Sequence, residues 1–220
     1  MKGKLLIVFK SAHGYVKRYV DIIGNALGCD AVPADKVRAD MFGAYDKILF
    51  ISALRGYSPV GMNKFAKYVE AIYKKLIVCG VGVAPFSRDI PARIKDASIS
   101  VMYEKFVPVF YARGGFDFEE LSRTEKMGVT LTLRRINMSE VLDDSDTAFK
   151  NAAAQPFDDV KRENIQPLID YLDGKPVNAE LFSPPEITDP EQEKQFFDEM
   201  EKAANAPDDA KRALKKKLKK

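Results

Sequence analysis

Five short apolar runs, separated by stretches with helical spacing, constrain the fold of this chain more than any other feature. The runs cover residues 5–9, 29–33, 47–52, 76–81 and 106–111, and the second of them is short and weak. Near-continuous apolar strands with helices between them are typical of a parallel sheet covered on both faces. The pattern therefore predicts a small three-layer α/β/α sandwich with a five-stranded parallel sheet. Pro108, which cannot donate to a strand ladder, favours a sheet edge for the fifth strand.

The first strand ends in a small polar loop that opens a helix. The loop covers Ser11–Val16, and the residues after it place one apolar face on a helix: Val16, Tyr19, Val20, Ile23 and Leu27. Backbone N–H groups and the positive end of the helix dipole both point at whatever occupies such a loop. The opening of the chain therefore predicts a binding site for a phosphorylated ligand.

The remaining helices follow from spacing and capping signals. Met62–Tyr73 has one apolar face, on which we expect Met62, Phe65 and Val69 to be core residues, and a further helix is expected over residues 88–95. Ser122 and Glu125 have capping-box spacing for a helix that reaches about residue 136. Residues 143–155 are polar and predict a loop or a frayed helix, and the last core-facing helix covers residues 165–172.

The end of the chain has a different composition. Asp189-Pro190 and 207–209 each have the pattern of a helix start, and the charge changes from acidic (186–201) to basic (211–220). We therefore expect a domain over residues 1–174 and a charged helical or flexible extension over residues 175–220. The basic end is expected to be a solvated tail, with weak contact to an anionic membrane as the alternative.

Charge and composition exclude several classes of protein. The net charge is +3, but without the seven Lys and Arg of the last ten residues the remaining chain carries −4. We therefore expect no nucleic-acid partner. The sequence has no apolar stretch of about 20 residues and no cleavage pattern of a signal peptide, which predicts a cytoplasmic protein. Cys29 and Cys79, its two cysteines, are expected to stay reduced as small buried side chains.

Three segments together resemble a known family. They are Ser11–Lys17 after the first strand, Ile51–Tyr57 at the end of the third, and Phe110–Asp117 at the end of the fifth. In this order and spacing the chain is similar to the flavodoxin-like fold, and more specifically to the flavodoxin-domain family that includes the menaquinone-dependent protoporphyrinogen oxidases. The resemblance covers about residues 3–172 and leaves the tail outside it.

The resemblance implies a strand order of 2-1-3-4-5, a helical insertion after strand five, and flavin mononucleotide (FMN) as the cofactor. Ligands of this fold bind at the carboxyl ends of the strands, at the switch point between strands one and three. The phosphate would contact Ser11–Val16, and the isoalloxazine ring would lie between Leu54–Tyr57 and Val83–Phe86. The implied cofactor-binding residues are Ser11, Ala12, His13, Gly14, Tyr15, Val16, Ala53, Leu54, Arg55, Gly56, Tyr57, Val83, Ala84, Pro85, Phe86, Arg113 and Gly114.

Individual residues of this set leave alternatives open. His13 and Val16 stand where flavodoxins usually carry hydroxyls, and His13 is the only histidine, which excludes a histidine-pair metal site. We expect His13 to make a local hydrogen bond rather than to act as a general acid or base. Tyr57 could stack on the ring or cover the end of the sheet. Arg55 could favour the reduced flavin anion or be a solvated loop residue, and Arg113 with its glycines could approach a substrate or turn the chain.

The leading hypothesis is an FMN-dependent redox protein, either an electron-transfer protein or an oxidoreductase, whose partner is another protein or a quinone. The flavin would do the chemistry, and no catalytic side chain or metal site is expected. Two alternatives remain: a flavin-free interaction module on the same scaffold, and a quinone-dependent enzyme of the protoporphyrinogen oxidase type.

Overall fold

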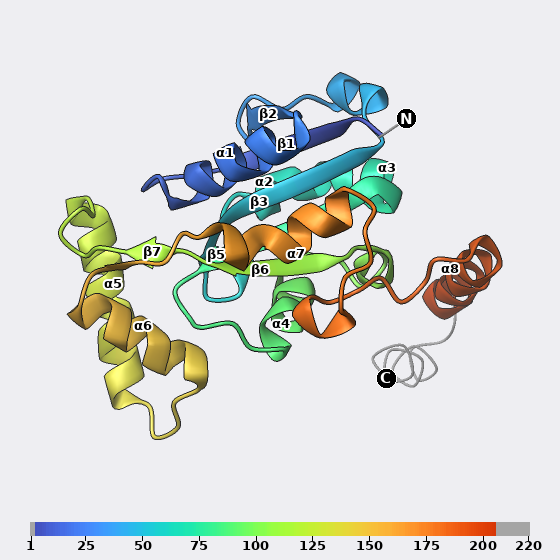
Figure 1. Ribbon diagram of the computed structural model, residues 1–220. Coiled ribbons are helices and arrows are strands. Elements are labelled where there is room, and N and C mark those ends of the chain that lie inside the picture. Colours follow the sequence, from blue (N-terminus) through green and yellow to red (C-terminus); the bar gives the residue numbers. More distant parts are fainter. Residues whose placement is uncertain (1–2, 206–220) are drawn as a thin grey trace.

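A parallel sheet forms the centre of the protein, as a computed structural model shows for residues 3–205 (Figure 1). Its strands are β1 (Leu5–Lys10), β2 (Asp30–Pro33), β3 (Lys47–Arg55), β5 (Leu76–Gly82) and β6 (Val109–Arg113), in the order β2-β1-β3-β5-β6. All four pairings along this path are parallel. In sequence order this is the predicted 2-1-3-4-5 arrangement, because β4 (Ser58–Pro59) pairs only with β3 and lies off the path.

Helices cover both faces of the sheet, because successive strand residues point to opposite sides. On one face Leu49 and Ile51 pack against α1 (Tyr15–Leu27) and α7 (Arg162–Leu172). On the other face Ile48 and Phe50 pack against α2 (Met62–Phe65), α3 (Val69–Ile72) and α4 (Asp89–Ser98). The predicted three-layer α/β/α sandwich of flavodoxin-like topology is confirmed.

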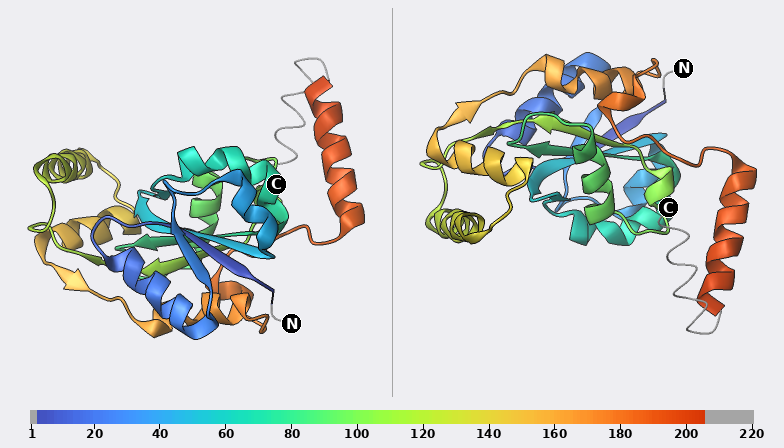
Figure 2. Two further views of the ribbon diagram at one scale, coloured as in Figure 1. Left: turned by 90° about the horizontal axis from the view of Figure 1, so that it is seen from above. Right: turned by 90° about the horizontal axis from the view of Figure 1, so that it is seen from below.

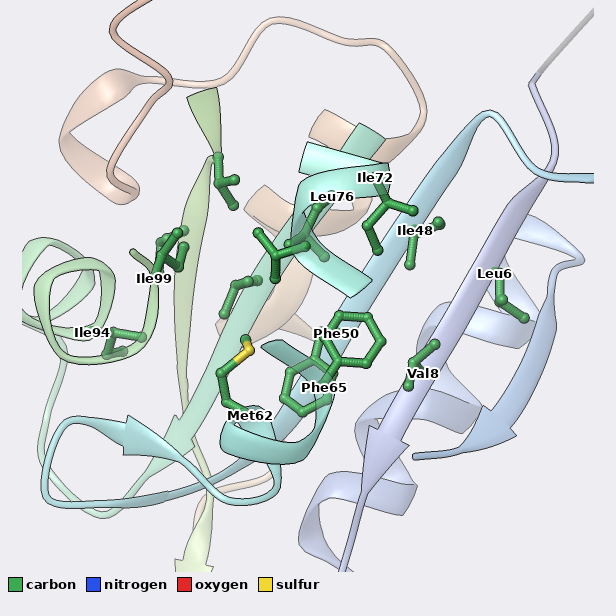
Figure 3. Close-up of a cluster of buried hydrophobic side chains, with 14 of the residues drawn as sticks. Leu6, Val8, Ile48, Phe50, Met62, Phe65, Ile72, Leu76, Ile94 and Ile99 are labelled. Carbon is green, nitrogen blue, oxygen red and sulfur yellow. The ribbon is translucent and has the colours of Figure 1, made fainter. Parts of the chain in front are cut away.

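The second of these cores is aromatic at its centre (Figure 3). Phe50 on β3 and Phe65 on α2 lie with ring centroids 4.7 Å apart, and both side chains are fully buried. Met62 and Val69 are 3% and 5% exposed, so the three predicted core positions of this segment are confirmed.

The segment that bears these residues is not the continuous helix that its spacing predicts. Two short 3₁₀ turns, η2 (Ala66–Tyr68) and η3 (Tyr73–Lys75), follow α2 and α3. Tyr68 lies in the first turn and makes edge contacts with Phe42 and Phe65, at 5.2 Å and 5.7 Å between ring centroids. Phe42 belongs to a third 3₁₀ segment, η1 (Ala39–Ala44), in the predicted connector between β2 and β3.

A helical insertion follows β6, as the resemblance implies. It consists of β7 (Gly115–Phe116), α5 (Arg123–Met138), α6 (Asp144–Ala154) and β8 (Phe157–Asp158), with β7 and β8 paired antiparallel at its base. Ser122 and Glu125 form the predicted capping box of α5. Residues 144–154, expected to be a loop or a frayed helix, form a regular helix because the Asp143 side chain accepts a hydrogen bond from the Asp146 N–H at its start.

The chain beyond α7 first returns to the sheet. Ser183 and Val109 exchange backbone hydrogen bonds of 2.8 Å and 2.9 Å, which cover the outer edge of β6. Phe182 stacks on Phe110 at 4.5 Å, and a short 3₁₀ turn, η5 (Ala179–Leu181), precedes it. Pro108 directly precedes β6, the outermost strand on that side, so its predicted edge position is confirmed.

The last described element is α8 (Pro190–Asn205), which begins at the predicted Asp189-Pro190 signal. It docks on η3 and on a further turn, η4 (Glu104–Phe106), through aromatic rings, of which Phe106 and Phe197 stack at 5.5 Å. Figure 2 places α8 and α5 at opposite ends of the molecule. The predicted helix start at 207–209 and the basic residues 211–220 lie outside the described residues. Between residues 3 and 205, no helix combines the length and apolarity needed to span a membrane.

Candidate functional site at the carboxyl ends of the strands

The loops that follow β1, β3, β5 and β6 meet at one end of the sheet, because parallel strands place their carboxyl ends together. The chain leaves β1 through α1 to reach β2 on one side, and then returns to β3 on the other side of β1. This reversal is the switch point at which open α/β sheets bind ligands. The insertion projects from the same end of the sheet (Figure 1).

The loop after β1 leaves the start of α1 open. Gly14 occupies the N-cap position with φ of 83° and carries no side chain that could cap the helix. A Cβ at Gly14 would meet nothing within 4 Å, so the space beside the loop is free. Ser11 Oγ accepts a hydrogen bond of 3.3 Å from the Lys17 N–H. Val16 is 2% exposed and belongs to the core beside α1, so its side chain does not face this loop.

His13 contacts a carboxylate that lies 112 residues further along the chain. Its Nε2 is 2.9 Å from Oε1 of Glu125, at the start of α5. The other oxygen of Glu125, Oε2, accepts hydrogen bonds from the backbone N–H and the hydroxyl of Ser122, at 2.9 Å and 2.6 Å. The Ser122 donors and then His13 lower the pKa of Glu125 to about 2, so this group is a carboxylate at neutral pH.

The expected local hydrogen bond of His13 is therefore a long-range contact between the β1 loop and the insertion. Sequence reasoning assigned Glu125 only to the capping box and found no carboxylate for His13. Nothing in the spacing along the chain signals that the two residues meet, because their contact depends on how the insertion folds back. Tyr15 takes part in the same closure, since its ring packs directly against Gly115 at the start of β7.

The residues after the predicted third strand (47–52) form a β-hairpin. β3 continues to Arg55 and pairs with β4, so that Leu54 lies opposite Pro59 and Arg55 opposite Ser58. The Leu54 side chain packs over Gly80 and Gly82, where any Cβ would come within 3.3 Å of it. Of the predicted ring-binding residues here, Ala53 and Leu54 are half-buried, and Arg55 and Gly56 form the exposed tip.

Tyr57 links this hairpin to two other elements. Its hydroxyl lies 2.7 Å from Nη1 of Arg93 on α4 and 3.3 Å from Oδ2 of Asp143, the residue that caps α6. Arg93 also bonds Asp143 directly at 3.0 Å, and its guanidinium lies over the Tyr57 ring at 5.0 Å. Backbone hydrogen bonding from Asp146 and the contacts with Arg93 and Tyr57 lower the pKa of Asp143, although burial opposes them. Arg93 and Asp143 were absent from the sequence-based site.

The loop after β5 is bonded to β6. Val83 O accepts a hydrogen bond of 3.2 Å from Nε of Arg113, and Ala84 O accepts one of 2.5 Å from the Tyr111 hydroxyl. Burial raises the pKa of this tyrosine, so it remains a donor. The two residues that follow, Pro85 and Phe86, are exposed, and Phe86 is 41% exposed.

Arg113 and Gly114 hold the base of the insertion. The Arg113 guanidinium lies over the Phe157 ring at 4.7 Å and 3.5 Å from Oδ2 of Asp159, beyond β8. Gly114 donates to Gly82 O at 2.8 Å and accepts from the Asp159 N–H at 3.0 Å. A Cβ at Gly114 would lie 2.7 Å from the Val81 side chain, so glycine is needed for this close approach. These contacts are those of a chain turn, which is one of the two interpretations of this segment.

Apart from the buried Val16 side chain, the predicted residues lie at one end of the sheet, where contacts between side chains form two clusters. One contains the open start of α1 with His13 and Glu125, and the other contains Tyr57, Arg93 and Asp143. Within residues 3–205 no group of three or more His, Cys, Asp or Glu side chains could hold a metal ion, and both cysteines are free. A pocket of about 570 Å³ lies elsewhere, between α7 and residues 176–181.

Comparison of the sequence with known proteins identifies no family, and comparison of the structure finds only distant similarity. No family model matches the chain, and no curated protein matches it significantly. Similar solved structures include a flavodoxin from the domain Archaea (20% identity, 44% of this chain and 76% of that chain, TM-score 0.33). Another is Flavodoxin 2 from Bacillus cereus (19% identity, 50% of this chain and 84% of that chain, TM-score 0.35). A third is two-electron reduced Megasphaera elsdenii flavodoxin (16% identity, 49% of this chain and 82% of that chain, TM-score 0.35).

Proposed function

We propose that this protein binds FMN at the β1/β3 switch point and acts as a redox protein, in electron transfer or as an oxidoreductase. The observation that carries the proposal is the start of α1, where the N-cap residue Gly14 has no side chain and an open glycine loop lies at that point of the sheet. Free backbone N–H groups at a helix start favour a phosphate.

The phosphate end of the proposed site fits the residues present. The backbone of residues 12–16 and the Ser11 hydroxyl would hold the phosphate, and Gly14 leaves room beside them. Lys17 does not add a free charge, because its ammonium group pairs with Asp21 one turn along α1. The site would therefore depend on backbone donors, as expected when the usual loop hydroxyls are missing.

The ring end would lie between the β3–β4 hairpin and the loop after β5. Leu54 and Tyr57 on the hairpin, with Pro85 and Phe86 opposite, are the groups that would contact an isoalloxazine ring. The flavin, when bound, supplies the redox chemistry. The chain positions the ring and limits its contact with water, and the bonds of Tyr57 to Arg93 and Asp143 fix one wall of that site.

The test is a visible absorption spectrum of the purified protein, repeated after gel filtration with excess FMN and, separately, with riboflavin. We expect retained flavin bands with FMN and much weaker retention of riboflavin, which lacks the phosphate. Ser11→Ala and Gly14→Val should then weaken FMN retention while leaving that of riboflavin unchanged. A colourless protein that retains neither flavin would refute the proposal.

A flavin-free interaction module on the same scaffold is the second candidate. The observation in its favour is that His13 and Tyr57, two predicted cofactor residues, already bond to Glu125 and Asp143 of the insertion. Protein that folds normally but takes up no flavin in the test above would support this candidate.

A quinone-dependent enzyme of the protoporphyrinogen oxidase type is a narrower form of the first proposal. The insertion of α5 and α6 after β6, at the end of the sheet that carries the proposed site, favours it. Oxidation of a porphyrinogen with menaquinone as acceptor, measured on FMN-loaded protein, would support it, and flavin binding without that activity would leave the electron-transfer protein. We also propose a cytoplasmic location and a solvated tail at residues 211–220, with weak contact of that tail with an anionic membrane as the alternative.

A further inference from the structure

The outward face of α5 is unlike a solvated helix surface. Met127, Leu131 and Met138 lie on one side of this helix and are 61%, 57% and 85% exposed. Val141 and Leu142, just beyond its end, are 81% and 41% exposed. The described residues include eight exposed large apolar side chains, and five of the eight are these residues between 127 and 142. The exposed apolar surface of the described chain is therefore concentrated on and beside α5.

Arginines share this face with the apolar residues. At 3.6 residues per turn, Arg123 and Arg134 project within about 40° of Met127, and both are exposed. Neither makes an ion pair with another residue of the described chain. The acids nearest in sequence do not share the face: Glu125 points inward to His13, and Glu140 lies beyond the end of the helix. We call this face, made of Arg123, Met127, Leu131, Arg134 and Met138, the α5 outer face.

The inner face of the same helix accounts for its attachment to the protein. Ile136 is buried, Val129 and Leu133 are half-buried, and Glu125 bonds His13. α5 therefore already has a side that packs on the body and on α6, and the outer face is not required for folding. Large exposed apolar patches on a protein surface mark interaction sites.

We propose that the α5 outer face is a docking site for a partner protein that presents an apolar groove bordered by carboxylates. The anchors are Met127, Leu131 and Met138, and the spacing of four and seven residues between them is that of a helix laid in a groove. Arg123 and Arg134 supply the charge complement, because guanidinium groups pair with carboxylates in a bidentate manner. Met and Arg are also the residue types enriched at protein interfaces, whereas Lys is depleted there.

Other occupants fit this face less well. An interfacial helix in a membrane carries its charges on the polar face and often adds Trp or Phe, whereas here Arg134 lies in line with the methionines and the face has no aromatic ring or lysine. A second copy would bring two arginine-bearing faces together. The residues 211–220 of the same chain carry the same sign of charge as the arginines. A helix of 16 residues is about 24 Å long, which suits a small, transient interface.

The test places a photo-crosslinking residue, p-benzoylphenylalanine, at position 131 of the full chain in the cells that make it, and at position 101 as a control. Val101 is 49% exposed and lies outside the α5 outer face. We expect a protein adduct from position 131 only. Its yield should fall at least tenfold with Arg134→Glu and stay unchanged with Lys194→Glu, which reverses an exposed charge on α8 at the other end of the molecule. The partner peptide in the adduct should combine apolar residues with Asp or Glu.

Three results would overturn the proposal. The first is an adduct whose yield does not respond to Arg134→Glu, or no protein adduct at all. The second is an adduct between two copies of this chain, with a concentration-dependent dimer in sedimentation velocity that Leu131→Glu abolishes. The third is flotation of the protein with vesicles of phosphatidylcholine and phosphatidylserine that Leu131→Glu abolishes. Thermal unfolding of each variant confirms that a lost adduct is not a lost fold.

Discussion

The sheet-bearing body and the insertion are built in different ways. Every residue of β3 from Ile48 to Ile51 is fully buried, and both faces of the sheet carry large apolar clusters. Between residues 115 and 158, only Ile136 and Ala152 are buried apolar residues. Because burial of apolar area is the main favourable term in folding, most of the stability must come from the body.

The insertion is attached to the body mainly by polar contacts, because the β7–β8 pair lies within the insertion itself. The polar links to the body include His13 with Glu125, Tyr57 and Arg93 with Asp143, and Arg18 with Asp158. Contacts of this kind between partly exposed groups contribute little each. Apolar contact is limited, as where Tyr15 packs against Gly115 and Ala148 packs against the core of the body. We therefore expect the insertion to open at a lower free-energy cost than the body.

The largest effect is expected from Phe50→Ala in the body. The side chain is fully buried and packs on Phe65 at 4.7 Å, so removing it leaves a cavity in the core. We expect a loss of about 3–5 kcal/mol in the free energy of unfolding, measured by urea denaturation. Phe149→Ala in the insertion, whose half-buried ring meets Phe116 at 6.0 Å, is the matched control and should cost far less. Equal losses for the two variants would contradict the division between body and insertion.

Gly115→Ala should detach the insertion without unfolding the body. A Cβ here would overlap the Tyr15 ring and lie 2.7 Å from Phe157 O, so the β7–β8 pair must shift. We expect a loss of about 1–3 kcal/mol, localised to the insertion. Hydrogen exchange should accelerate over residues 115–158 and stay unchanged in β1 and β3.

Gly128→Ala is the matched control for that change. Gly128 lies inside α5, a Cβ there would meet nothing within 4 Å, and the substitution should slow exchange in α5 because alanine favours a helix by about 1 kcal/mol. Faster exchange spread evenly over the whole chain with Gly115→Ala would show that the insertion and the body unfold together.

The same division explains what the sequence could predict. The five parallel strands and the helices that cover them follow from apolar runs and spacing, because each element has its own burial pattern, whereas the order of the strands came from the family resemblance. The positions of α1 and α7, the capping box at Ser122 and the edge position of β6 were predicted correctly for this reason. Apolar residues that recur every 3.6 residues in a helix, or every 2 in a strand, indicate which side of the element is buried. The body consists almost entirely of helices and strands with such a buried side.

The candidate site was predictable only in its location. The loops at the carboxyl ends follow from strand order, but the partners of His13 and Tyr57 lie 112 and 86 residues away and depend on how polar side chains of the insertion fold back. The hairpin at Leu54–Pro59 was not predicted, because its residues lie beyond the apolar run of the third strand. The hairpin forms because Gly56, at φ of 61°, turns the chain back on that strand. Amphipathic spacing also could not show that the outer face of α5 is exposed, since it fits a helix that faces the core equally well.

A smaller effect is expected from Asp143→Ala. This residue caps α6 through the Asp146 N–H at 2.7 Å and bonds both Arg93 and Tyr57, so the variant loses the cap and the link to α4 together. We expect a cost of about 1 kcal/mol, seen as faster hydrogen exchange in α6. Asp143→Asn keeps a good cap but removes the charge, and should lie between the wild type and the alanine variant. If the two variants behave alike, the Arg93 contact rather than the cap holds this end of the insertion.

The smallest effect concerns the pH dependence of the contact between His13 and Glu125. The Ser122 donors and His13 lower the pKa of Glu125 in the folded protein to about 2, from an ordinary value of 4.5. A carboxylate whose pKa is depressed on folding stabilises the folded state fully at pH values above its ordinary pKa, and this contribution is lost as the pH falls from there through about 2.

Glu125→Gln keeps the capping geometry but cannot ionise. The difference in free energy of unfolding between wild type and this variant should therefore decrease steadily as the pH falls from about 4.5 to about 2. Because the group is exposed, the change is expected to be small, and urea denaturation at each pH measures it. A difference that does not vary with pH over this range would mean that the negative charge of Glu125 adds nothing to the hydrogen bonds that the glutamine side chain also makes.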